Sequence, residues 1–165
     1  MSLRASVGQT LVSQLADCAT WRALLGAASA TAARTQIVLG DGGLGDGVSV
    51  DGDPIDAALP LATIRAGRLT AETIALGCHV YSGDATLDIF ILPDATLSAD
   101  DDRARLDALA AIVTELQEQI GTVLSDGNPA FLGGIFTAEG WQLEPDDTQD
   151  ARWQLPITCA WSQLP

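Results

Sequence analysis

The chain contains no lysine, a single histidine, three cysteines and no long apolar run. Its eight basic residues are all arginines and are scattered along the sequence, whereas a nucleic-acid-binding surface needs clustered cations that displace counterions from phosphates. We therefore expect no sequence-specific binding of nucleic acid. No apolar stretch approaches the ~20 residues that a transmembrane helix requires, so we expect no membrane partner.

The scarcity of histidine and cysteine limits the possible chemistry. His79 is the only histidine, which excludes multi-histidine metal sites. Cys18, Cys78 and Cys159 are odd in number and far apart, which argues against a disulfide framework and against zinc sites built on close cysteine pairs. We expect three buried, reduced thiols, no cofactor, no metal and no catalytic residues, in a protein that is not an enzyme.

Acidic and apolar residues dominate instead. The chain carries 22 Asp and Glu residues and a formal net charge of −14, with 47% hydrophobic and 18% charged residues. This balance is typical of a folded globular protein rather than a disordered one. We expect one domain over residues 1–165, with a helical part at 1–39, a flexible Gly/Asp loop at 40–58 and an α+β core at 59–165.

The Gly/Asp loop is the most unusual segment. Residues 40–56 read GDGGLGDGVSVDGDPID, and both residue types favour loops. The segment contains a G-x-G-x-x-G string, but no helical pattern begins there, as a dinucleotide site would require. Calcium binding by Asp41, Asp46, Asp51 and Asp53 is the alternative to a solvated loop, although EF-hand spacing is missing.

Two helical patterns flank this loop. Apolar residues recur at helical spacing over residues 7–25, with Gly26 as a stop signal, and a helical turn follows at residues 29–36. After the loop and the first strands, residues 98–121 predict one long amphipathic helix that begins at Ser98 as the N-cap. Its first turn is acidic, which complements the helix dipole, and its apolar stripe is formed by Leu106, Leu109, Ala110, Val113, Leu116 and Ile120.

Alternating apolar residues predict a first β-hairpin between the loop and the long helix. After a strand at residues 59–66, we expect a strand at 73–81, a turn at 82–84 and a returning strand. The inner face is then formed by Ile74, Leu76, Cys78, Val80, Leu87, Ile89 and Ile91. The alternation assigns His79 to the opposite face as a surface or interface residue, and Phe90 and Leu92 predict a cover on that face too.

A second hairpin ends the chain. Its strands are expected at residues 135–143 and 153–161, joined by an acidic turn that contains Asp146 and Asp147. Trp141, Trp153 and Trp161 are expected in its core. Pro156 has no N–H to donate, which indicates that the last strand lies at a sheet edge, where it is open to a neighbour.

These elements together predict an α+β fold: a mixed, mainly antiparallel sheet of two hairpins, with one long helix packed on it and an N-terminal helix. We expect interaction residues in the Gly/Asp loop, in the acidic turn, at His79 and at Pro156.

The element order and several local strings resemble the tail terminator proteins of long-tailed phages of the lambda type. The matching segments are residues 59–64 (LPLATI), 87–93 (LDIFILP), 100–120, 140–143 (GWQL), 145–147 (PDD) and 153–161. The resemblance implies a virion structural protein of the tail or neck that forms a ring, typically a hexamer, on the tail tube. It further implies a tail-tube protein and a head–tail connector protein as partners, assembly in the host cytoplasm, no enzymatic activity and no cofactor. A closely related head–tail joining protein is covered by the same resemblance.

A second hypothesis belongs to another class of protein. The same sequence is compatible with a small α+β ligand-binding or enzymatic domain that uses the Gly/Asp loop over its sheet. The oligomer count and the partner that each surface contacts are left open by the sequence.

Overall fold

The computed structural model describes residues 3–40, 59–125, 131–144 and 152–163, and it has the expected α+β architecture. In chain order the elements are α1 (Leu3–Asp17), α2 (Ala19–Leu25), α3 (Ala30–Arg34), β1 (Ile37–Leu39), β2 (Leu61–Ala75), β3 (Cys78–Ile91), α4 (Ala99–Leu109), α5 (Ala111–Ser125), β4 (Phe131–Ala138), β5 (Gln142–Glu144) and β6 (Arg152–Gln163). The Gly/Asp loop and the acidic turn lie outside the described residues.

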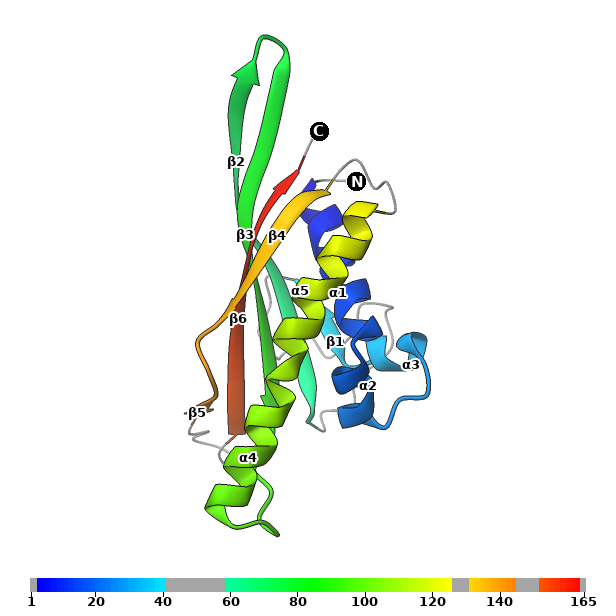
Figure 1. Ribbon diagram of the computed structural model, residues 1–165, viewed down its shortest axis with the longest axis vertical. Coiled ribbons are helices and arrows are strands. Elements are labelled where there is room, and N and C mark those ends of the chain that lie inside the picture. Colours follow the sequence, from blue (N-terminus) through cyan, green and yellow to red (C-terminus); the bar gives the residue numbers. More distant parts are fainter. Residues whose placement is uncertain (1–2, 41–58, 126–130, 145–151, 164–165) are drawn as a thin grey trace.

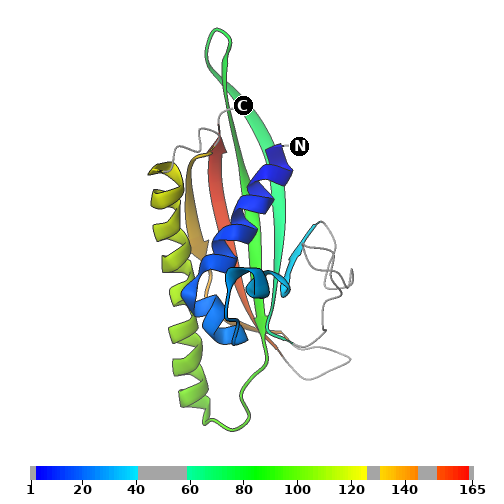
Figure 2. The same cartoon turned by 90° about the vertical axis from the view of Figure 1, so that its right-hand side faces the viewer.

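The strands form one sheet in the order β1-β2-β3-β6-β4, with β5 beside β6. Only β1 and β2 are parallel, so the sheet is mixed and mainly antiparallel, as predicted. Helices α1 and α5 lie along one face of this sheet (Figure 1, and Figure 2 from the side). The N-terminal part shares the core of the sheet, because Leu11 and Leu15 of α1 belong to the same buried cluster as Ile64 and Leu87.

The expected N-terminal helix is two helices. The backbone of Cys18 leaves the helical region (ψ 124°) and separates α1 from α2. Cys18 makes no side-chain cap, and the carboxylate of Glu115 in α5 accepts hydrogen bonds from the N–H and the hydroxyl of Thr20 instead. A residue far along the chain thus caps α2, which local periodicity cannot reveal. The predicted stop at Gly26 is confirmed by its left-handed backbone (φ 63°).

The first hairpin turns earlier than predicted. The turn lies at Leu76 and Gly77, where Gly77 adopts φ 78°, and not at residues 82–84. Residues 82–84 lie inside β3, where Gly83 is opposite Leu69 on one side and Trp161 on the other. The glycine that marked the turn in the sequence therefore belongs to a strand that is paired on both sides.

The prediction for the first half of the inner face is wrong as well, because the turn lies at Leu76 and Gly77. Ile74 and Leu76 are 62% and 105% exposed, and Cys78 is exposed as well. Leu87, Ile89 and Ile91 are buried as predicted. These three lie where β3 crosses the helix-covered part of the sheet, whereas the turn-proximal residues extend past it.

The long helix begins as predicted but is interrupted. The Ser98 hydroxyl accepts a hydrogen bond from the N–H of Asp101, so the N-cap is confirmed. Ala110 separates α4 from α5, and the two follow one another along a single line (Figure 1). Helix α5 continues to Ser125, past the predicted end at Gly121. Its buried contacts to the core include Ile112, which the predicted stripe omitted.

Pro156 is not on an edge strand. Strand β6 pairs with β3 on one side and with β4 and β5 on the other. The carbonyl of Pro156 accepts a hydrogen bond from the N–H of Glu139, which lies in the gap between β4 and β5. In an antiparallel strand the N–H and the C=O of one residue point to the same side. A backbone N–H at position 156 would therefore point toward the gap between β4 and β5, so its absence in proline removes no hydrogen bond to β3.

Gly67 gives a direct test of the β2–β3 register. It lies in a bulge of β2, and a Cβ built there would be 2.4 Å from the backbone oxygen of Asp84. Because backbone cannot move aside as a side chain can, we expect Gly67→Ala to lower the free energy of unfolding by about 1–3 kcal/mol. The measurement is chemical denaturation. Thr70→Ala, at an exposed site of the same strand, is the control and should change stability by less than about 1 kcal/mol; equal effects would contradict the close approach.

Candidate interaction surfaces

The structure describes two of the eight expected interaction residues. Asp41, Asp46, Asp51, Asp53, Asp146 and Asp147 lie outside the described residues. His79 is near the hairpin turn, whereas Pro156 is opposite Asp88, further along β3. The two positions are about 30 Å apart at the usual rise of a strand. They therefore belong to different surfaces.

The first surface is the outer end of the β2–β3 hairpin, residues 72–80, called the arm here. Strand β6 pairs with β3 only from Tyr81 onward, and β1 pairs with β2 only at residues 62–64. The arm is thus a two-stranded ribbon that extends beyond the body of the protein (Figure 1). Across it, the Thr73 hydroxyl and His79 Nδ1 are 3.1 Å apart. Ile74 and Leu76 form an exposed apolar tip.

The second surface is the outer border of β4. Its Gly134 carbonyl accepts a hydrogen bond from the side chain of Gln117 at 3.0 Å, and its Phe136 N–H donates to the same amide at 2.9 Å. One glutamine side chain from α5 thereby satisfies two backbone groups that a further strand would otherwise use. The sheet edge that we expected at Pro156 lies at β4 instead. The side chain of Gln117 occupies the backbone groups in the middle of this edge.

The helix-free face of the sheet carries a polar cross-strand contact. Asp88 is 7% exposed and accepts a hydrogen bond from Gln154 Nε2 at 3.1 Å, with the guanidinium of Arg65 at 3.7 Å. Beside it, the guanidinium of Arg152 lies 4.7 Å from the centre of the Phe90 ring. The predicted cover of Phe90 is thus partly supplied by this cation–π contact. Leu92, expected to share that cover, is 49% exposed.

Sequence reasoning missed a polar anchor at the start of α4. The carboxylate of Asp102 accepts hydrogen bonds from Arg105 (2.6 and 2.9 Å) and from Trp153 Nε1 (3.2 Å), and Arg105 also donates to the carbonyl of Leu92. Trp141 Nε1 donates to the Leu106 carbonyl at 2.7 Å. Two tryptophans of the last hairpin therefore bind α4 through hydrogen bonds, whereas only Trp161 is fully enclosed in the core. The i,i+3 spacing of Asp102 and Arg105 was the available sequence signal.

The third surface is an open hollow of about 420 Å³ at the opposite end of β2 from the arm. It is formed by the end of α2, by α3 and by the residues that precede β2, namely Leu24, Leu25, Gly26, Ala27, Ala28, Ala32, Thr35, Gln36, Leu59 and Pro60. None of these described lining residues is charged, so the hollow can accept apolar groups.

Over residues 3–40, 59–125, 131–144 and 152–163, no group of three or more His, Cys, Asp or Glu side chains is placed to hold a metal ion. In the same ranges no helix has the length and apolar character to cross a bilayer. No protein-family model and no curated protein matches the sequence.

Asp102 predicts a specific pH dependence. Partial burial would raise the pKa of Asp102, but hydrogen bonds from Arg105, the Asp94 N–H and Trp153 outweigh it and hold this pKa below its ordinary value. The folded state is thus stabilised above the ordinary carboxyl pKa of about 4, and this contribution is lost as the pH falls through the lower, folded-state pKa. We expect Asp102→Asn to reduce stability by about 1–2 kcal/mol at pH 7.

The difference between wild type and Asp102→Asn should shrink as the pH is lowered from about 4 to 2. Denaturation at a series of pH values measures it. Asp107→Asn, at an exposed position of the same helix, is the matched control and should change stability at pH 7 by less than about 0.5 kcal/mol. A difference for Asp102→Asn that is constant with pH would contradict the assigned role.

The three cysteines should differ sharply in reactivity. Burial raises the pKa of Cys18 to about 12, with a further contribution from the nearby Glu115 carboxylate, and burial raises the pKa of Cys159 to about 12. Cys78, expected to be buried, is exposed on the arm. Since the thiolate is the reactive form, a maleimide at pH 7 should label one thiol per native chain, at Cys78. Mass spectrometry after proteolysis locates the label; native-state labelling of Cys18 or Cys159 would contradict this burial.

Proposed function

We propose that this chain is a phage or prophage virion structural protein, a tail terminator or head–tail joining component that forms a ring on the end of the tail tube. The observation that carries the proposal is the arm. Ile74 and Leu76 are the exposed end of a ribbon that has no further strand on either side within the described chain. Such a ribbon is marginally stable in water alone and gains stability when another chain covers it.

The order of elements supports the same proposal. An extended hairpin, a helical rod and the three last strands follow one another between residues 61 and 163, within the stretch 59–165 over which the sequence resembles tail terminators. The helical rod lies against the sheet and leaves the arm free (Figure 1). A protein whose partners are other virion components needs this kind of rigid body with a projecting contact element.

The charge of the chain fits a ring through which DNA passes. A formal net charge of −14 repels phosphate, so a duplex would slide through such a ring without adhering to its wall. The dispersed arginines offer no cluster that would arrest it.

The proposal is tested with the purified chain and the tail-tube protein of the same phage or prophage. We expect rings at the ends of tubes in negative-stain images, and tubes that stop growing when the chain is added. Leu76→Asp, which places a charge at the arm tip, should reduce the fraction of capped tubes at least tenfold, whereas Ala71→Asp, at an exposed position nearer the base of the arm, should reduce it less. Uncapped tubes of normal growth with the wild-type chain would exclude the proposed function.

A further inference from the structure

The two borders of the sheet differ in how they are covered. On one side β1 pairs with β2 only at residues 62–64, so the rest of β2 has no neighbouring strand there in the described part of the chain. On the other side β4 ends the strand order, and the side chain of Gln117 occupies two of its backbone groups. One border is therefore an open strand edge, and the other becomes one if the side chain of Gln117 moves away.

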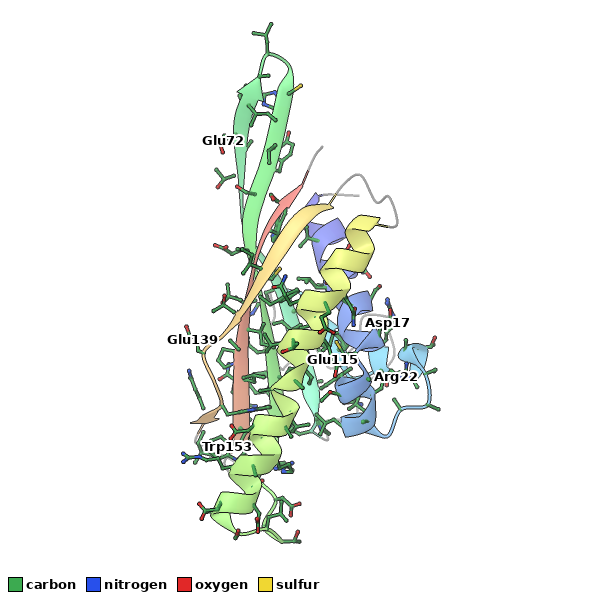
Figure 3. All side chains as sticks on the ribbon, in the orientation of Figure 1. Asp17, Arg22, Glu72, Glu115, Glu139 and Trp153 are labelled. Atoms are coloured by element: carbon green, nitrogen blue, oxygen red, sulfur yellow. The ribbon has the colours of Figure 1, made fainter. Side chains whose placement is uncertain are left out.

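Strand β4 and the uncovered part of β2 lie at the same level across the sheet. Among residues 64–71 of β2, the described part of β1 pairs only with Ile64. Figure 3 shows Glu139, which directly follows β4, and Glu72, which lies past the opposite end of β4 at the base of the arm. A second copy at the same height, turned about an axis along the strands, would thus bring its open β2 border beside β4. The level is marked by two rows of directly opposite residues, Ala138–Ile157–Leu87–Ile64 and Phe131–Gln163–Tyr81–Ala71.

The strand directions favour an antiparallel contact between such copies. Each of the pairs β2–β3, β3–β6 and β6–β4 is antiparallel, so β4 runs opposite to β2. Residues 131–138 of β4 include no charged residue, so the contact brings no like charges together. The bulge between Ala66 and Leu69 interrupts β2, and we expect regular pairing over residues 69–73, which β3 also pairs without interruption.

The side chain of Gln117 controls access to the β4 border. Its amide donates to the carbonyl of Gly134 and accepts from the N–H of Phe136. Gln117 is exposed on α5, so its side chain can rotate into solvent without opening the core. A strand along the eight residues of β4 would bond more backbone groups than these two. Because each such hydrogen bond contributes a similar net free energy, a neighbouring strand can displace the side chain.

We infer that neighbouring copies join their sheets, with β4 of one copy beside β2 of the next, and that the Gln117 side chain blocks this contact in the separate chain. Two different borders meet, so the contact is heterologous, and each addition leaves one β2 border and one β4 border for the next copy. Repetition closes a ring when the rotation between copies allows it. The inference rests on the proposed assembly role and specifies the contact between copies and its control.

The first test removes the blocking side chain. Gln117→Ala releases the two backbone groups of β4, and Thr114→Ala, at an exposed position of the same helix, is the control. In analytical ultracentrifugation we expect Gln117→Ala to form oligomers at a concentration about tenfold lower than wild type, because association no longer has to break two hydrogen bonds. Thr114→Ala should match wild type. Equal association of Gln117→Ala and wild type, with unchanged circular dichroism, would overturn the blocking role.

A cross-link identifies which strands meet and does not depend on the Gln117 variant. Two chains both carry Cys78→Ser, which removes the exposed native thiol. One also carries Ile135→Cys on β4 and the other Thr70→Cys on β2, at exposed positions on the same face of the sheet. In an equimolar mixture, a short bis-maleimide should join unlike chains about tenfold more than like chains, as measured by mass spectrometry, and Gln117→Ala should raise the yield.

The products of this reaction decide the inference. Cross-links mainly between like chains would indicate a two-fold pairing of β2 or of β4 and would overturn the contact, as would a mixture that gives no cross-link at any concentration. The proposed function is judged separately. Wild-type rings on tail tubes without the cross-link between unlike chains would keep the function and reject this contact, whereas the cross-link without tube binding would do the reverse.

Discussion

The structure depends on the pairing of two strands that are longer than their neighbours. Strands β2 and β3 have 15 and 14 residues, and they continue to pair with each other beyond the point where β6 ends its register with β3 at Tyr81. The inner halves of these strands bury Ile64, Leu87 and Ile89 under the helices, which anchors the hairpin in the core. The outer halves have no such cover and form the arm. The β2–β3 ladder, which has irregularities between residues 66 and 69 and between residues 73 and 75, thus connects the core to the exposed arm.

The helices are held against the sheet and against each other by side chains from distant parts of the sequence. At one end, Asp102 of α4 contacts Trp153 of β6, and Trp141 contacts the carbonyl of Leu106. Further along, Glu115 of α5 caps the first turn of α2. These contacts fix the angle of the helical rod on the sheet, while the apolar residues between them supply the burial. They also place α2 and α3 beside the start of β2, which creates the hollow.

The sheet exposes its backbone selectively. Gln117 satisfies the middle of the β4 border, and β5 continues the same side of β6 beyond Pro156. Edge protection of this kind prevents indiscriminate strand pairing between copies. The opposite border of the sheet is less covered, because β1 pairs with β2 only at residues 62–64 and the rest of β2 has no neighbouring strand on that side in the described part of the chain.

The sequence by itself determined the fold class, the Ser98 and Gly26 helix signals and the buried faces of the inner strands, because these follow from local periodicity and capping chemistry. It misplaced the hairpin turn, since Gly83 resembles a turn residue until its two neighbouring strands are known. Only the tertiary structure decided that Pro156 is internal, that Cys78 is exposed and that α2 is capped by Glu115. Each of these depends on which distant segments become neighbours, and a one-dimensional pattern of residues carries no information on that adjacency.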